Sequence, residues 1–335
     1  MNEKRLVDFL QNPNTYPEAP GGIRLVQTHI SWVFIGDDYV YKVKKPVDFG
    51  FLDFSTLEKR RFFTHEELRL NKRFSPDVYL EVVPISQAGD SYRLGDDSNV
   101  IEYALKMKRI DENKMLFELL KQDRVGKDDM VKVGKHLSNI YGRIESDKKA
   151  QAFGTLEVIS TNVIENFDQT RKYIDGPISK EKFHALESWS RDFMDKNKAL
   201  FEARIAGGHI KDCHGDLHLQ HICMENTGIS IFDCIEFNER FRFGDVASDV
   251  AFLSMDFDYN SQAELGDAFV DAYVDASGDF SMREVLKFYK VYRAYVRAKV
   301  TSFMLDDTGL DESKRQSALE TARNYYDLAY GYITE

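Results

Sequence analysis

Hydrophobic and polar residues alternate in short runs along the first third of the chain. Three such runs follow one another between residues 23 and 43, and Gly36-Asp37-Asp38 separates the second from the third. Alternation with a period of two, broken by a Gly/Asp turn, predicts antiparallel strands joined by a hairpin. Two more runs lie at 79–85 and 99–107, with glycine and aspartate clusters between them. We therefore predict a small antiparallel sheet of five strands within residues 1–108.

Helical spacing of apolar residues appears in this region mainly at residues 55–74, and it dominates the rest of the chain. It is interrupted between residues 212 and 233, where a turn separates two short apolar runs and predicts another hairpin. The pattern predicts an α+β protein with two lobes. The first, residues 1–108, holds a lead-in helix, the sheet and one helix. The second, residues 109–335, is mainly helical and contains the hairpin.

Charge and cysteine content narrow the class of partner. The sequence has 45 basic and 56 acidic residues and a formal net charge of −11, which argues against nucleic acid or an anionic membrane as partner. No segment has the length and apolarity of a membrane span, and the N-terminus lacks the apolar stretch of a signal peptide. Three cysteines do not make a disulfide framework and suit a reducing compartment. We expect a cytoplasmic protein.

The candidate chemistry is concentrated in two short strings. Residues 213–223 read Cys-His-Gly-Asp-Leu-His-Leu-Gln-His-Ile-Cys, and residues 231–238 read Ile-Phe-Asp-Cys-Ile-Glu-Phe-Asn. Together they resemble the aminoglycoside phosphotransferase branch of the protein-kinase-like superfamily. Residues 40–54 are similar to an uncharacterised subgroup of that branch, some members of which are joined to a P-loop domain. This sequence has no Gly-x4-Gly-Lys-Ser/Thr motif, so we expect the kinase-like module alone.

The resemblance implies a protein-kinase-like two-lobe fold and an ATP-dependent phosphotransferase. Such an enzyme moves the γ-phosphate to a hydroxyl group of an acceptor, here a small molecule whose identity stays open. Catalysis of this transfer is mainly positioning and charge neutralisation. By resemblance, Asp216 is the catalytic aspartate, and Asp233 holds the Mg²⁺ or Mn²⁺ of the bound ATP, a role that suits a carboxylate. By the same resemblance, His214 and His218 hydrogen-bond their loop and hold Asp216 in place. Asp245 and Asp249 are similar to structural aspartates that cap or brace the loop after the metal-binding aspartate.

The resemblance also implies a nucleotide site in the first lobe. Lys42 is similar to the lysine that pairs with the phosphates, and Glu66 on the following helix is similar to its ion-pair partner. Strand alternation places Lys44 on the same face of the sheet as Lys42, so Lys44 is an alternative candidate for the phosphate-pairing lysine. Glu67, which is adjacent to Glu66, is an alternative candidate for the ion-pair partner of that lysine. The other expected nucleotide contacts are a phosphate-covering turn with Thr28, His29 and Ser31 and a hinge with Met107 and Lys108.

One position departs from the family pattern. The family usually has an asparagine as a second metal ligand five residues after the catalytic aspartate, and His221 stands there in this sequence. Imidazole is a softer ligand than an amide oxygen, so one interpretation is a metal preference that shifts from Mg²⁺ towards Mn²⁺. The alternative interpretation is a catalytically weak or inactive pseudokinase that still binds nucleotide.

The same strings raise a third interpretation, a zinc-binding module. Thiolates and imidazoles are the ligands that structural zinc prefers, but the sequence has no Cys-x2-Cys pair. Cysteines beside strand-forming apolar residues are more often small buried side chains. The zinc ligands would have to come from Cys213, His214, His218, His221, Cys223 and Cys234.

Overall fold

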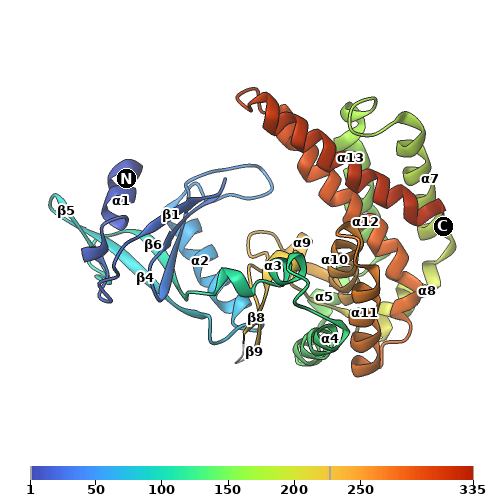
Figure 1. Ribbon diagram of the computed structural model, residues 1–335, viewed down its shortest axis with the longest axis horizontal. Helices are drawn as coiled ribbons and strands as arrows, with labels where there is room; N and C mark the ends of the chain where they lie inside the picture. The colour runs from blue at the N-terminus through green and yellow to red at the C-terminus, as the bar shows by residue number, and fades with distance from the viewer. Residues whose placement is uncertain (1, 226–227, 335) are drawn as a thin grey trace. The chain divides into compact units, whose positions relative to one another are not determined.

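The computed structural model describes residues 2–225 and 228–334. The chain divides into two compact units, each made of two segments (Figure 1). The first unit combines Met1–Gln122 with Gln220–Glu239, and the second combines Asp123–Leu219 with Arg240–Glu335. Within the described ranges, no helix combines the length and the apolarity needed to cross a membrane.

A six-stranded antiparallel sheet forms the centre of the first unit, with the strand order β1-β2-β3-β6-β4-β5. The predicted α+β class and antiparallel sheet are confirmed, but the sheet has one strand more than predicted. The additional strand is β5, which forms a hairpin with the end of β4 inside the Gly- and Asp-rich segment. The sequence does not predict it because its four residues lie between two turns in a segment whose composition favours a loop. The strands are β1 Arg24–Gln27, β2 Ser31–Ile35, β3 Tyr39–Lys44, β4 Tyr79–Ala88, β5 Ser91–Leu94 and β6 Val100–Lys108.

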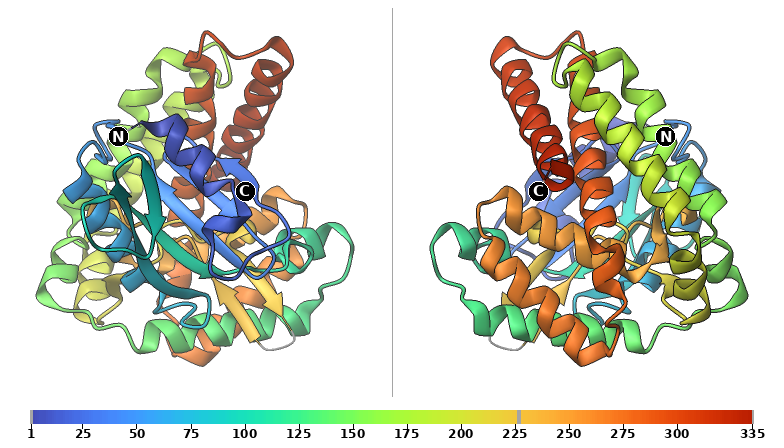
Figure 2. Two further views of the ribbon diagram at one scale, coloured as in Figure 1. Left: turned by 90° about the vertical axis from the view of Figure 1, so that its left-hand side faces the viewer. Right: turned by 90° about the vertical axis from the view of Figure 1, so that its right-hand side faces the viewer.

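Two helices cover the two faces of this sheet. Helix α1 (Glu3–Leu10) buries Leu6 and Leu10 against a cluster that includes Ala104, and Figure 2 shows it lying across the strands. Helix α2 (Leu57–Asn71) packs on the other face, where Leu105 belongs to a second apolar cluster. Ala104 and Leu105, which are consecutive residues of β6, therefore lie on opposite faces of the sheet, as successive side chains of a strand do. Helix α3 (Leu116–Lys121) ends the first segment of this unit.

The predicted hairpin consists of β8 (Ile222–Glu225) and β9 (Gly228–Ile231). Its turn residues 226–227 lie outside the described residues. We expected the hairpin in the second lobe, but its main chain packs into the first unit. The Ser75 hydroxyl donates to Ile231 O at 2.7 Å and accepts from Ile231 N at 2.8 Å, and Asn71 Oδ1 accepts from Cys234 N at 2.9 Å. The lobe boundary at residues 108–109 stays a prediction.

The second unit is mainly helical, with α10 at its centre. All side chains of α10 from Val246 to Phe257 are buried, which is typical of a helix surrounded by others. A short two-stranded sheet joins β7 (Ile210–Asp212) to β10 (Phe243–Asp245). The helices are α4 Lys127–Gly142, α5 Lys148–Ala152, α6 Leu156–Thr170, α7 Lys180–Lys196, α8 Lys198–Ala206, α10 Val246–Tyr259, α11 Ala263–Ser277, α12 Met282–Phe303 and α13 Glu312–Thr334, with α9 Glu239–Arg242 at the boundary between the units.

Helices α4 and α11 pack against each other. Gly134 lies at the contact, where a Cβ atom would be 2.7 Å from Phe269 O and 2.9 Å from Tyr273 N. Because main-chain atoms cannot move aside as a flexible side chain can, we expect Gly134→Ala to lower the free energy of unfolding by about 1–3 kcal/mol. Chemical denaturation measures this value.

Gly142 is the matched control, because it lies in the same helix and a Cβ atom there would meet nothing within 4 Å. We expect Gly142→Ala to leave stability unchanged or to raise it by up to about 1 kcal/mol, since alanine favours helix more than glycine does. Equal effects of the two substitutions would contradict the close packing of α4 on α11.

Candidate active site

Lys42 lies at the centre of a network of charged side chains in the first unit. Its Nζ is 2.7 Å from Asp233 Oδ1 and 2.8 Å from Glu67 Oε1. Burial alone would lower the pKa of Lys42, but the negative charges of Asp233, Glu67 and Glu236 outweigh it and raise the pKa above the usual range of a lysine. Lys42 is therefore a charged group held between two acidic side chains.

Glu67, and not Glu66, is the helix glutamate that pairs with Lys42. Glu66 forms an ion pair with Arg69, with 2.7 Å between Arg69 Nη2 and Glu66 Oε2. The sequence-based assignment of Glu66 is therefore wrong, and the alternative that we considered, Glu67, is the partner of Lys42. Residues at helical spacing from Glu67, namely Thr64, Leu70 and Asn71, are buried with it on the sheet-facing side of α2. That spacing is a signal that would have selected Glu67 from the sequence.

Lys44 is more deeply buried than Lys42 and contacts the other oxygen of Glu67. Its Nζ is 2.6 Å from Glu67 Oε2, forms an ion pair with Glu236 Oε1, and lies 4.6 Å from the centre of the Phe54 ring. Burial would raise the pKa of Glu67, but its two lysine neighbours lower it instead. No pattern in the sequence identified Glu236 as a member of this network.

Asp233 follows β9 with a backbone conformation that is uncommon for residues other than glycine. Its φ is +64°, in the left-handed region that aspartate tolerates better than most residues. The Asp233 N–H donates to the hydroxyl of Tyr79 at 3.0 Å. Nearly half of the carboxylate side chain is exposed, at 46%. The main chain thus holds a partly accessible carboxylate beside Lys42.

The ring of His221 lies beside the same carboxylate. His221 Nε2 is 3.7 Å from Asp233 Oδ2, while Asp233 Oδ1 contacts Lys42. Two ligand atoms on one divalent ion are about 3–3.5 Å apart at ordinary bond lengths. A carboxylate oxygen and an imidazole nitrogen at this separation fit a divalent metal after a small adjustment. The two predicted metal ligands are therefore brought together in the first unit.

The face of the sheet that carries the two lysines is apolar next to them. Strand register pairs Val26 with Val33 and Val33 with Lys42, and pairs Ile35 with Val40 and Val40 with Met107. Val26 is exposed, and Val33, Ile35, Val40 and Met107 are half-buried. One sheet face thus presents an accessible apolar surface that leads to a charged end.

The predicted phosphate-covering turn is closed by its own hydrogen bonds. Thr28 Oγ1 accepts from Ser31 N at 2.9 Å and from Ile30 N at 3.3 Å, and Ser31 is fully buried. Thr28 and His29 are exposed. Of the predicted amide donors, the N–H groups of Thr28 and Ser31 are already used within the turn. A role for this turn in binding phosphates stays a prediction.

The hinge segment is also engaged by neighbouring strands. Lys108 N donates to Val78 O at 2.8 Å, and Arg109 N donates to Asp38 O at 2.8 Å. Met107 packs in the cluster of Leu105 and Tyr79. Any contact of this main chain with adenine is still a prediction.

In the second unit, Asp249 and Arg293 hold the loop that carries Asp216. Asp249 Oδ2 accepts from His214 N at 2.8 Å and from Gly215 N at 3.2 Å, and Arg293 Nη1 donates to Gly215 O at 2.9 Å. Gly215 has a φ of +86°, which favours glycine at this turn. Asp249 thus braces the loop that carries Asp216, whereas the resemblance implied such a role at the loop after Asp233. Arg293 is an additional brace that the motif did not reveal.

The motif histidines take different places around Asp216. His214 is fully buried, and its Nδ1 accepts from Asp216 N at 3.3 Å. His218 Nε2 is 3.5 Å from Asp216 Oδ2, and about a third of the Asp216 side chain is exposed. Asp256 of α10 accepts from Leu219 N at 3.0 Å and fixes the end of the loop. The loop is rigidly held while the Asp216 carboxylate stays accessible.

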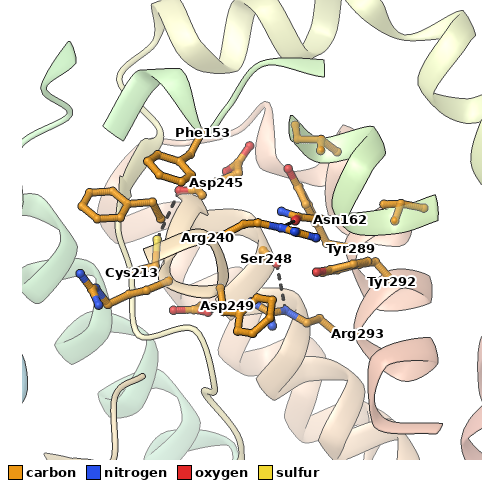
Figure 3. Close-up of a pocket in the computed structure, with 16 residues that line it drawn as sticks. Phe153, Asn162, Cys213, Arg240, Asp245, Ser248, Asp249, Tyr289, Tyr292 and Arg293 are labelled. Carbon is orange, nitrogen blue, oxygen red and sulfur yellow. Dashed lines mark hydrogen bonds and ion pairs between the residues drawn. The ribbon is translucent and has the colours of Figure 1, made fainter. Parts of the chain in front are cut away.

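A small cavity lies behind this loop within the second unit (Figure 3). Figure 3 shows Arg293 reaching Ser248 and Arg240 reaching Asn162 across its walls, with Cys213 at one side. The cavity has a volume of about 50 Å³. That volume accommodates a few water molecules but no sugar or nucleotide. Its walls include Asp249 and Arg293, the two residues that hold the loop.

The cysteines do not form the predicted zinc alternative. All three are buried, and Cys213 Sγ donates to Gly244 O at 3.3 Å. Among the residues that the structure describes, no cysteine belongs to a group of three side chains that could hold one metal ion. The thiols thus behave as small buried side chains.

The chain matches a family of known phosphotransferases over its central part. A model of the phosphotransferase enzyme family matches residues 181–289, a segment that includes both Asp216 and Asp233. Together with the fold, this match confirms the predicted resemblance to the aminoglycoside phosphotransferase branch of the protein-kinase-like superfamily.

Among the relatives, an uncharacterized protein of Mycobacterium tuberculosis (strain ATCC 25618 / H37Rv) is 28% identical over 274 residues. The match covers 82% of this chain and 53% of that protein. The chain therefore spans about half the length of the curated relatives it matches.

Solved structures of small-molecule kinases share the fold over nearly the whole chain. The choline kinase of Cryptosporidium parvum Iowa II has a TM-score of 0.57 at 9% identity, covering 99% of this chain and 95% of that one. The GDP complex of aminoglycoside 2'-phosphotransferase-IIIa has a TM-score of 0.54 at 10% identity, covering 98% and 99%. The amicoumacin kinase hAmiN in complex with AMP-PNP, Ca²⁺ and Ami has a TM-score of 0.54 at 11% identity, covering 97% and 93%. At such low identity these structures show the fold alone.

Proposed function

We propose that the protein is a phosphotransferase that moves the γ-phosphate of ATP to a hydroxyl group of a small molecule. The observation that carries the proposal is the position of Lys42, which lies between Glu67 and Asp233 at the charged end of an otherwise apolar sheet face. An apolar surface suits a purine ring, and a lysine beside a metal-binding carboxylate suits the phosphates. The family match over residues 181–289 supports the same class of reaction.

In this proposal, Asp233 and His221 hold a divalent metal ion. When bound, the ion neutralises charge on the phosphates of ATP. Lys42 then exchanges its contact with Asp233 for the phosphate oxygens and keeps its contact with Glu67. Asp216 orients the acceptor hydroxyl and accepts its proton at a carboxylate oxygen. His218, which lies beside Asp216 Oδ2, helps to hold that carboxylate in place.

The acceptor belongs to the proposal only as a class. The solved structures that share this fold include kinases whose names refer to choline, aminoglycosides and amicoumacin, all of which are small molecules. We propose an acceptor of similar size with a free hydroxyl group, and a cationic amine or aminosugar is the first class to test. A screen for ATP-dependent phosphorylation of such compounds, read by mass spectrometry, tests the proposal. ATP binding without transfer to any acceptor or to water would favour the pseudokinase.

His221 gives the proposed metal site a testable preference. Because imidazole suits Mn²⁺ better than Mg²⁺, we expect wild-type protein to bind ATP more tightly with Mn²⁺. We expect His221→Asn to shift the Mn²⁺/Mg²⁺ affinity ratio towards Mg²⁺ by about tenfold, or roughly 1.4 kcal/mol. Titration calorimetry with each ion measures the ratio.

The matched control is His65→Asn, because His65 lies in the same unit on the exposed side of α2, where its ring contacts Tyr103. This control is expected to leave the ratio unchanged. An identical ratio in wild type and His221→Asn would exclude His221 as a ligand.

A further inference from the structure

The network around Glu67 contains a second lysine and a second glutamate that the proposed reaction does not use. Lys44, Glu67 and Glu236 come from β3, α2 and the segment after β9. Glu67 uses one oxygen for each lysine, Oε1 for Lys42 and Oε2 for Lys44. Lys44 in turn bridges Glu67 and Glu236. The two lysines therefore share one carboxylate but differ in their second partner.

Burial separates the roles of the two lysines. The side chain of Lys44 is 2% exposed, and it is enclosed by two carboxylates and the face of the Phe54 ring. The side chain of Lys42 is 14% exposed, and its second partner Asp233 is nearly half exposed. A lysine that is enclosed on all sides by fixed partners cannot reach a ligand without breaking a buried ion pair, which is costly. Only Lys42 is placed to exchange partners.

We infer that Lys44 and Glu236 are positioning residues that hold Glu67 so that Lys42 faces the phosphates. This inference rests on the proposed function, since it assigns a task within the same site. Glu236 fixes Lys44, Lys44 fixes Oε2 of Glu67, and Oε1 is thereby left pointing at Lys42. Because Glu236 is three residues after Asp233, the same pair also ties the metal-binding segment to α2 and β3. Without the pair, Glu67 is free to turn and Lys42 loses its fixed direction.

Lys44 and Glu236 have opposite charges, so both can be replaced together without changing the net charge of the network. The network holds two lysines and three carboxylates, Asp233 being the third. Removing Lys44 alone leaves two buried carboxylates with one lysine fewer, which destabilises the fold in any case. Removing Lys44 and Glu236 together leaves the net charge of the network unchanged. Apolar side chains of similar size are often tolerated in place of a buried ion pair.

The test compares the double variant Lys44→Met/Glu236→Leu with a matched pair on the same helix. Arg60 of α2 forms a buried ion pair with Glu102 of β6, with 2.7 Å between Arg60 Nε and Glu102 Oε2. Arg60→Met/Glu102→Leu therefore also removes a buried link between α2 and the sheet, but one without contact to Glu67. The first readout is the rate of Lys42 acetylation by trace acetic anhydride, measured by peptide mass spectrometry without ATP. The second is the Kd for ATP with Mn²⁺ or Mg²⁺.

We expect the Lys44/Glu236 variant to raise the Lys42 acetylation rate by at least about threefold and the Kd for ATP by about tenfold, relative to the control pair. Glu236→Gln alone, which keeps the size of the side chain, is expected to change both in the same direction by less. Glu236→Gln replaces the double variant in both measurements if the double variant does not fold. An acetylation rate of Lys42 equal to that of the control pair would overturn the inference. Absence of ATP binding by the wild type would contradict the proposed function, while the acetylation rate would still decide the inference.

Discussion

Asp216→Asn is expected to lower phosphate transfer by about 10²–10⁴-fold while leaving the fold and ATP binding intact. An amide has the same size as the carboxylate but cannot accept the proton of the acceptor hydroxyl. The loop around Asp216 is fixed by Asp249 and Arg293 through the main chain of His214 and Gly215. The substitution therefore leaves the bonds that hold the loop unchanged. ADP release in the presence of the acceptor found by screening measures the rate.

Asp195→Asn is the control for this experiment. Asp195 lies in the same unit, and 75% of its side chain is exposed next to Lys198. We expect the control to transfer phosphate at the wild-type rate. Undiminished transfer by Asp216→Asn would contradict the assignment of the catalytic aspartate, and a loss of thermal stability in that variant would show that the residue is structural.

The largest loss of stability is expected from Arg204→Met. Arg204 is 1% exposed and pairs through two nitrogens with Asp245, the N-cap of α10, at 2.6 and 2.8 Å. It also contacts Asp279 in the loop before α12. Without the guanidinium, two buried carboxylates lie near each other without their main cation. We expect the free energy of unfolding to fall by about 3–5 kcal/mol, as measured by denaturant titration.

The pH dependence of this loss follows from the charges. Burial by itself would raise the pKa of Asp279, but His209 and Arg204 lower it well below its usual range. A lowered folded-state pKa gives stability that is present above the unfolded pKa and is lost as pH falls through the folded value. Removing Arg204 takes away one of the two charges that lower the pKa of Asp279, so in the variant this buried carboxyl takes up a proton at a higher pH. The difference between variant and wild type is expected to shrink from pH 7 to pH 5.

Arg191→Met is the control for the stability effect. Arg191 forms an exposed ion pair with Glu187 on α7, at 2.9 Å between Nη2 and Oε1. Exposed pairs contribute little, so we expect a change below about 1 kcal/mol with no trend between pH 7 and pH 5. A similar loss in both variants would contradict the structural role of the buried arginine.

The sequence predicted the sheet well where its strands were long or bounded by clear turns. Alternation and turn residues located β1, β2, β3, β4 and β6, since each run alternates with a period of two and ends at turn residues. Strand β5 was not predicted because its four residues lie inside a Gly- and Asp-rich segment whose composition favours turns. The hairpin of β8 and β9 was predicted, but its packing partner was not. That choice depends on Ser75 and Asn71, which are distant from the hairpin in sequence.

In the candidate site, too, residues within a local motif could be predicted from the sequence, whereas contacts between distant segments could not. Asp216 and Asp233 stand in a recognisable string, whereas the choice between Glu66 and Glu67 depended on which side of α2 faces the sheet. The burial of Thr64 and Leu70 decides this choice, and their helical spacing was available in the sequence. Glu236 and Arg293 had no such signal, because their contacts join segments that only the folded chain brings together.

Titration calorimetry of ATP with Mg²⁺, with Mn²⁺ and without metal, on wild type and on Asp233→Asn, tests the nucleotide site most directly. Asp90→Asn, a fully exposed substitution in the same unit, is the control. We expect metal-dependent ATP binding in the wild type and the control, and its loss by about tenfold or more in Asp233→Asn. ATP affinity that is equal in all three proteins, or absent from the wild type with either metal, would contradict a nucleotide site built on Lys42 and Asp233.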